Sequence, residues 1–119
     1  MLDREALRAH CLSLPGASED FPFGPEAAVY KVAGKMFALI PVEAAPPSIS
    51  LKCDPLRAAM LRDTFAAITP AYHMNKKHWN GLLIDGTVPD DDVLELIEHA
   101  YTLVVASLTR KQRQLLNPP

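Results

Sequence analysis

Residues 72–80 hold most of the side chains in this sequence that suit the recognition of a polar ligand. They read YHMNKKHWN and combine two histidines, two lysines, two amides and the only tryptophan of the chain. Lysine and asparagine bind phosphates and the edges of bases, and an exposed aromatic ring stacks on a base. The segment therefore predicts contact with nucleic acid, provided that it lies on the surface.

The same residues have plainer explanations. A tryptophan at the start of a strand often fills the edge of a core, and adjacent lysines in a loop often serve only solubility. His73 and His78 have a spacing that matches no standard zinc site, and no cysteine or acid pair completes one. We therefore expect no metal and no cofactor, and one histidine that hydrogen-bonds a backbone carbonyl.

Catalysis lacks its usual sequence signals. There is no Gly-x-Ser-x-Gly, no Cys-x-x-Cys, no phosphate loop and no dinucleotide-binding glycine pattern. Glu19, Asp20 and Glu26 flank the FPFGP loop, but acids near turns more often serve solubility than catalysis. Cys11 and Cys53 are expected to be small buried hydrophobes. We predict that the protein is not an enzyme.

Composition and charge limit the class of protein and of partner. The 119 residues are 49% apolar and 22% charged, which is ordinary for one globular domain. The net charge of −2 argues against general polyanion binding, although six acids gather in residues 81–100, apart from the lysines of residues 72–80. We expect one monomeric domain over residues 1–119, with 109–119 a flexible or loosely packed tail.

The apolar segments and the cysteines predict the cellular compartment. The start, MLDREALRAH, has no apolar run of the kind that a signal peptide requires. All apolar stretches are far shorter than the roughly 18 to 20 residues of a membrane span. Two widely separated cysteines suit a reducing compartment. A cytoplasmic protein without a membrane partner is expected.

Helix and strand signals follow one another in an order typical of an α+β domain. Asp3 and Asp54 are expected N-caps, and Pro15-Gly16 ends the first helix. The expected elements are a helix over 4–14, a hairpin over 28–40, a strand over 48–52, a helix over 55–63, a strand over 78–84 and a helix over 90–108. This order favours two layers, an antiparallel sheet with helices packed on one face.

The segment between the first helix and the hairpin is expected to be an ordered loop, because Pro22, Gly24 and Pro25 exclude a helix interior and a central strand. Phe21 and Phe23 in this loop have two alternative roles. They form either an exposed aromatic ledge for a partner or a plug at the end of the core. We favour the plug.

Several ordered motifs resemble the MmcQ/YjbR family of small bacterial proteins, over nearly the whole chain. They are Leu14-Pro15-Gly16 with Phe21-Pro22-Phe23-Gly24, Leu51-Lys52-Cys53-Asp54-Pro55, and Tyr72-His73-Met74-Asn75-Lys76 with His78-Trp79. The resemblance implies a CyaY-like fold. It also implies DNA binding through a double-wing surface.

The resemblance also implies which residues contact DNA. By position these are Lys52, His73, Asn75, Lys76, Lys77, His78 and Trp79. The lysines are expected at phosphates, Asn75 or His73 near bases, and Trp79 in support of the surface. The alternative is a small anionic ligand or a protein partner, bound without catalysis by the FPFGP loop and residues 72–79.

Overall fold

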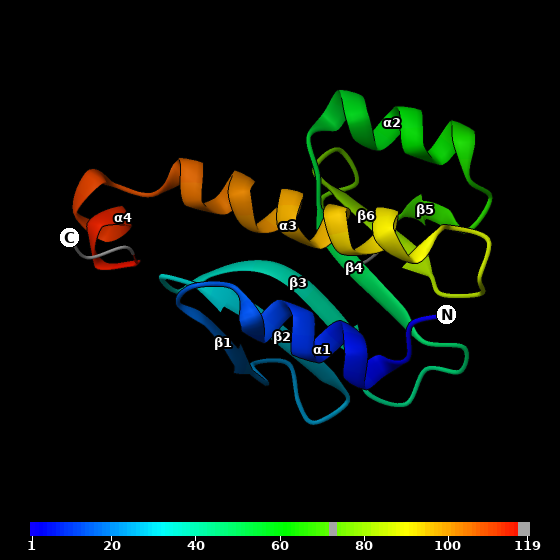
Figure 1. The fold of residues 1–119 in the computed structure, drawn as a ribbon, viewed down its shortest axis with the longest axis horizontal. Coiled ribbons are helices and arrows are strands. Elements are labelled where there is room, and N and C mark those ends of the chain that lie inside the picture. Colours follow the sequence, from blue (N-terminus) through cyan, green and yellow to red (C-terminus); the bar gives the residue numbers. More distant parts are fainter. Residues whose placement is uncertain (72–73, 117–119) are drawn as a thin grey trace.

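Six strands form one antiparallel sheet (Figure 1). The computed structural model describes residues 1–71 and 74–116. The strands lie side by side in the order β1-β2-β3-β4-β6-β5, and each neighbouring pair is antiparallel. Their bounds are β1 Ala17–Asp20, β2 Ala27–Val32, β3 Lys35–Pro41, β4 Ser48–Lys52, β5 Ile68–Pro70 and β6 Trp79–Leu83.

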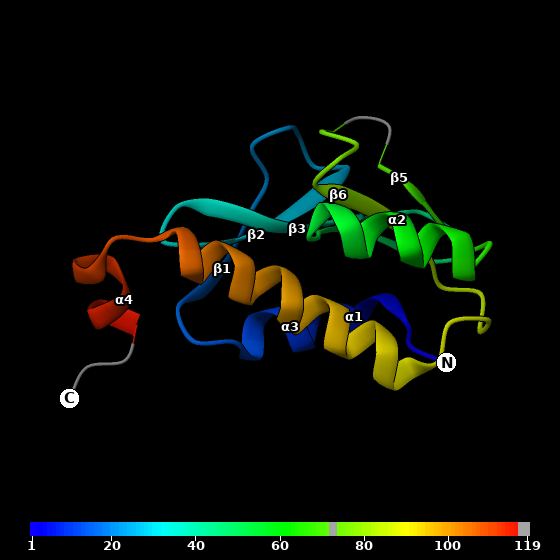
Figure 2. The same cartoon turned by 90° about the horizontal axis from the view of Figure 1, so that it is seen from above.

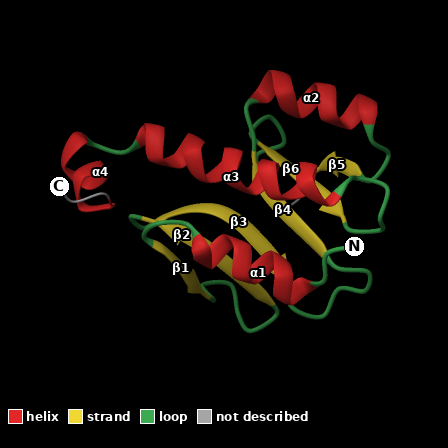
Figure 3. Cartoon of the chain, in the orientation of Figure 1, coloured by secondary structure: helices red, strands yellow, loops and turns green. Residues whose placement is uncertain are grey.

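The helices form the second layer (Figure 3). They are α1 Arg4–Ser13, α2 Pro55–Thr64, α3 Asp90–Ser107 and α4 Arg110–Leu116. Figure 2 shows α1 and α3 together beneath the sheet, and α2 beside β5 and β6. Asp3 caps α1 by accepting a hydrogen bond from the Ala6 N–H at 2.8 Å, and Asp54 caps α2 by accepting one from the Arg57 N–H at 3.1 Å.

The core lies between the sheet and these helices. In β4, Ile49 and Leu51 are buried in it, whereas Ser48, Ser50 and Lys52 alternate with them and are half-buried. Successive side chains of a strand point to opposite faces, so the three polar residues belong to the face away from the helices. The alternation in β4 therefore separates an apolar inner face from a polar outer face.

The predicted α+β class and its two layers are confirmed, and each predicted helix and strand is present within a few residues of its expected bounds. Three elements were not predicted. Residues 18–20, expected in a loop, pair with β2 as the edge strand β1, and residues 68–70 form the other edge strand, β5. β1 is too short and too polar to give a strand signal. β5 is too short, and its proline is typical of a position outside a central strand.

The third unpredicted element is α4, which lies inside the expected tail. None of its residues is fully buried, but Leu116 packs against the core beside Gly16. The flexibility of residues 109–119 stays a prediction. No helix in the described residues is both long and apolar enough to cross a membrane.

One polar side chain joins α2 to the sheet from inside. Asn80 of β6 is 1% exposed; its Nδ2 donates to the Ala58 carbonyl at 3.2 Å, and its Oδ1 accepts from Arg62 at 2.8 Å. A buried amide is stable only when its donors and acceptors are paired, and both bonds come from α2. Asn80 therefore fixes α2 on the same face as α1 and α3.

Replacing this amide should destabilise the protein without changing its fold. We expect Asn80→Ala to lower the free energy of unfolding by about 1 to 3 kcal/mol, because Arg62 and the Ala58 carbonyl lose a buried partner. Urea unfolding followed by circular dichroism measures this loss, with the slope unchanged. The control is Gln114→Ala, which removes an exposed amide of α4; equal effects of the two changes would show that Asn80 has no such role.

Candidate functional site

Two loops rise from the sheet on the side away from the helices (Figure 2). One is formed by residues 21–26 between β1 and β2, and the other includes residues 74–78 before β6. We call the sheet face between them the open face. Its central row consists of cross-strand partners, which share one face: Val29, Leu39, Ser50, Gly81 and Thr69.

The apolar hollow is a cavity of about 300 Å³ lined by Phe23, Ala27, Leu39 and Met74. Leu39 forms its floor in the central row, and Phe23 and Met74 come from the two opposing loops. Phe23 is 66% exposed, so the favoured interpretation of this ring as a core plug is wrong. The reason is geometric, because the loop leaves β1 on the open side while the core lies on the helix side.

The second cavity, of about 370 Å³, has a largely apolar lining that includes three hydroxyls, those of Ser48, Ser50 and Thr69, and we call it the polar hollow after them. Gly81 lies between Ser50 and Thr69, and its lack of a side chain leaves the floor low. The two hollows are adjacent, since Leu39 of the first is the direct cross-strand partner of Ser50 in the second. We call the two neighbouring hollows together the trough; their lining residues come from β2 to β6 and from both loops.

The described residues among those predicted from the sequence lie in the second loop and where β4 and β6 meet it. Asn75, Lys76, Lys77 and His78 are exposed in the loop, and the Asn75 side chain accepts from the Lys77 N–H at 2.9 Å. The loop joins the sheet where the His78 carbonyl accepts from the Cys53 N–H at 2.7 Å. His73 lies outside the described residues.

Lys52 and Trp79 are cross-strand partners and so lie on the open face together. Trp79 is only 9% exposed, so its ring offers little surface for stacking. A buried ring at this position instead supports the start of β6. The contact of Lys52 and Trp79 with DNA stays a prediction, and the burial of Trp79 leaves it a supporting position.

Charge is divided between the two faces of the molecule. On the open side, Lys31 forms an ion pair with Asp20 at 3.1 Å, and its hydrogen bond is the main cause of the lowered pKa of that carboxyl. Within the described residues, neither Lys52 nor Lys77 has an ion-pair partner. The acids of residues 90–98 belong to α3, on the helix side. The open side therefore carries Lys52, Lys76 and Lys77 together with the exposed Glu26 of the first loop, whereas the acids of α3 lie in the other layer.

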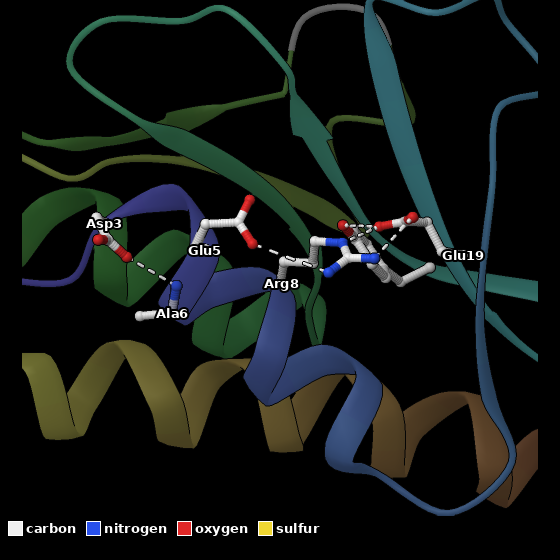
Figure 4. Close-up of polar contacts among 6 residues, drawn as sticks. Asp3, Glu5, Ala6, Arg8 and Glu19 are labelled. Atoms are coloured by element: carbon white, nitrogen blue, oxygen red, sulfur yellow. Dashed lines mark hydrogen bonds and ion pairs between the residues drawn. The ribbon is translucent and has the colours of Figure 1, made fainter.

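A hydrogen-bonded cluster holds the edge strand from which the first loop rises (Figure 4). Glu19 of β1 accepts from Arg8 Nε at 2.7 Å and from the Tyr30 hydroxyl at 2.8 Å. The bond from Arg8 is the main cause of the lowered pKa of Glu19, and burial is the main cause of the raised pKa of Tyr30. This cluster joins α1, β1 and β2, and so positions residues 21–26.

The chemistry that this arrangement offers is recognition. Burial raises the pKa of the Cys11 thiol to about 12 and also raises that of Cys53, which disfavours the nucleophilic thiolate. Within residues 1–71 and 74–116, no three histidine, cysteine or acidic side chains are grouped to hold a metal. The trough provides instead apolar walls, hydroxyls and ammonium groups, which suit a ligand with flat rings and negative charge.

Several residues of the trough were missed at the level of sequence. They are Ala27, Leu39, Ser48, Ser50, Thr69 and Gly81. The alternation of polar and apolar residues over 48–52 is the one sequence signal for a polar outer face, and it identifies the two serines. No local signal brings Met74 over Leu39 or Thr69 beside Gly81, because these contacts depend on the sheet order.

The comparisons with known proteins agree with each other. The model of the YjbR family matches residues 12–103. The uncharacterised Escherichia coli proteins YbdF and YjbR are 33% and 32% identical, covering 96% and 92% of this chain and 93% of each relative. A crystal structure of a Deinococcus radiodurans protein with a DUF419 domain superposes with a TM-score of 0.89 at 40% identity, over 97% of this chain and 88% of that one.

The Arg8–Glu19–Tyr30 cluster should make the stability of the protein depend on pH in the acidic range. Because the folded-state pKa of Glu19 is lowered, its contribution is present above the unfolded pKa of about 4.3 and is lost as the pH falls through the folded value. We expect Glu19→Gln to lower the melting temperature at pH 7 and to reduce the further fall between about pH 5 and pH 3.

The measurement is thermal unfolding across this pH range, with Glu43→Gln, at an exposed position, as the control. Parallel pH profiles for the wild type and Glu19→Gln would show that Glu19 does not contribute to the acid dependence.

Proposed function

This chain belongs to the YjbR family of bacterial proteins, and we propose that it binds DNA on its open face, between the two loops, without catalysing a reaction. The relatives reported above are uncharacterised, so the proposal rests on the geometry of the open face. The observation that carries it is that lysines of the second loop and of β4 lie on the open side of the sheet, on a face that no described helix covers.

The placement of the lysines supports the proposal. Phosphate contacts supply most of the affinity for DNA, and they need cations that reach solvent on one face. Lys76 and Lys77 are exposed in the loop, and Lys52 lies where β4 ends beside that loop. The acids of α3 lie in the other layer, so they do not repel a strand that approaches the open face.

The shape of the two loops also supports the proposal that the open face binds DNA. Phosphate contacts position a nucleic acid and base contacts specify its sequence; in this proposal the second loop contacts the backbone and the sheet between the loops faces the bases. Asn75 and His78 are exposed in the second loop and carry groups that hydrogen-bond to phosphates or to base edges. This geometry agrees with the double-wing role that the family resemblance implies.

A small anionic ligand is the second candidate, and the sizes of the hollows favour it. Cavities of about 300 and 370 Å³ fall at the lower end of the range for small-molecule pockets. A ligand that binds only the folded state raises the melting temperature. A thermal-shift screen of nucleotides and other anionic metabolites separates the candidates, since the DNA proposal expects no shift comparable to that given by an oligonucleotide.

The loop lysines should account for part of the salt dependence of DNA binding. We expect Lys76→Ala with Lys77→Ala to weaken binding and to make the plot of log K against log salt shallower by about 1.4 to 1.8, the value for two lost phosphate contacts. Fluorescence anisotropy of a labelled oligonucleotide at several salt concentrations measures both quantities.

The control for this double variant removes two cations elsewhere. Arg110→Ala with Lys111→Ala changes the net charge equally on α4, which lies at the end of the molecule away from the loop (Figure 1). An unchanged affinity and slope in the loop variant, or the same change in both variants, would reject the assignment of Lys76 and Lys77 to phosphates.

A further inference from the structure

We propose that the DNA bound on the open face is single-stranded, and that the apolar hollow receives one unpaired base between Phe23 and Met74. This inference rests on the proposed function and specifies its substrate. It is carried by the composition of the trough, by its length and by the position of the lysines beside it.

The apolar hollow has the walls that a base requires. Phe23 presents an exposed ring, Met74 faces it from the other loop, and Leu39 closes the floor. Bases stack favourably on aromatic rings whatever their sequence, and a methionine side chain adapts its shape to a flat partner. The hollow therefore suits a flat ring that enters with its face toward Phe23.

The polar hollow provides the hydrogen bonds that the next base would need. The hydroxyls of Ser48, Ser50 and Thr69 have no hydrogen-bond partner within the described residues. A hydroxyl both donates and accepts, so it pairs with the edge of any base. The hydroxyls therefore add hydrogen bonds beside the stacking site without selecting one base.

The length of the trough favours a strand over a single nucleotide. It crosses from β3 to β5 along the row Leu39, Ser50, Gly81 and Thr69. Three intervals between neighbouring strands of about 4.8 Å make roughly 14 Å. This exceeds one base, and Lys52, Lys76 and Lys77 beside the trough complement more than one phosphate.

Base pairing decides between single-stranded and duplex DNA. In a duplex, the faces of the bases are covered by their stacked neighbours, and only the edges are accessible in the grooves. A hollow that stacks on the face of a base is therefore filled only by an unpaired base. The lysines alone would bind both forms, so the hollow is what distinguishes them.

The test compares one fluorescein-labelled strand of 12 nucleotides with the same strand annealed to its complement. We expect the purified full-length protein to bind the single strand at least tenfold more tightly at low salt, as measured by anisotropy. Phe23→Ala should weaken single-strand binding about tenfold and leave duplex binding nearly unchanged. Leu56→Ala, which removes an exposed leucine of α2 in the other layer, is the matched control.

Gly81→Val gives a second test that does not depend on the first loop. An added Cβ at Gly81 would meet only Thr69, at 3.6 and 3.8 Å, which is ordinary contact. The fold should therefore accept the change while the branched side chain fills the floor of the polar hollow. We expect weaker single-strand binding with a melting temperature close to that of the wild type.

The outcomes separate this inference from the proposed function. Duplex binding as tight as single-strand binding, or unchanged single-strand affinity in both Phe23→Ala and Gly81→Val, overturns the inference and leaves DNA binding in place. Competition by free thymidine monophosphate as strong as that by the 12-nucleotide strand overturns it in favour of a small-ligand site. Absence of binding to both forms at low salt overturns the proposed function as well.

Discussion

The burial of one face of the sheet against α1 and α3 is the interaction on which the rest of the structure depends. It directs Ile49 and Leu51 of β4 inward, and the two-residue period of a strand then directs Ser48, Ser50 and Lys52 outward. The polar lining of the trough is therefore a direct consequence of how the core is packed. A shift of β4 by one residue would place apolar side chains in the trough and serines in the core.

The same constraint explains how much of the fold could be predicted. Long elements with a strong period, such as α3 and the β2–β3 hairpin, are defined by their own residues. The edge strands are not, since β1 has two acids among four residues and β5 includes Pro70; each becomes a strand because a neighbour offers hydrogen bonds. Phe23 was misjudged because hydrophobicity predicts burial but does not indicate on which side of the sheet a loop leaves.

The candidate site likewise has one part that the sequence predicts and one part that it does not. Residues 74–78 were found by composition and by family resemblance, because their unusual side chains are consecutive in the sequence. Leu39, Ser50, Gly81 and Thr69 come from four strands and meet only through the sheet order, so no local pattern joins them. Net charge says little about one face for the same reason. It sums over the chain, whereas a ligand meets one face, and here α3 carries many of the acids on the other.

A sheet with one uncovered face is at risk of pairing with another chain. The edge strands of this sheet reduce that risk. A sheet with apolar residues on an uncovered face could pair through its edge strands with another chain. Here β1 is four residues long with Glu19 and Asp20 in ion pairs, and β5 is three residues long with a proline that removes one donor. Pairing at either edge is therefore weak. The proposed ligand instead contacts the open face, which presents Leu39 and the three hydroxyls.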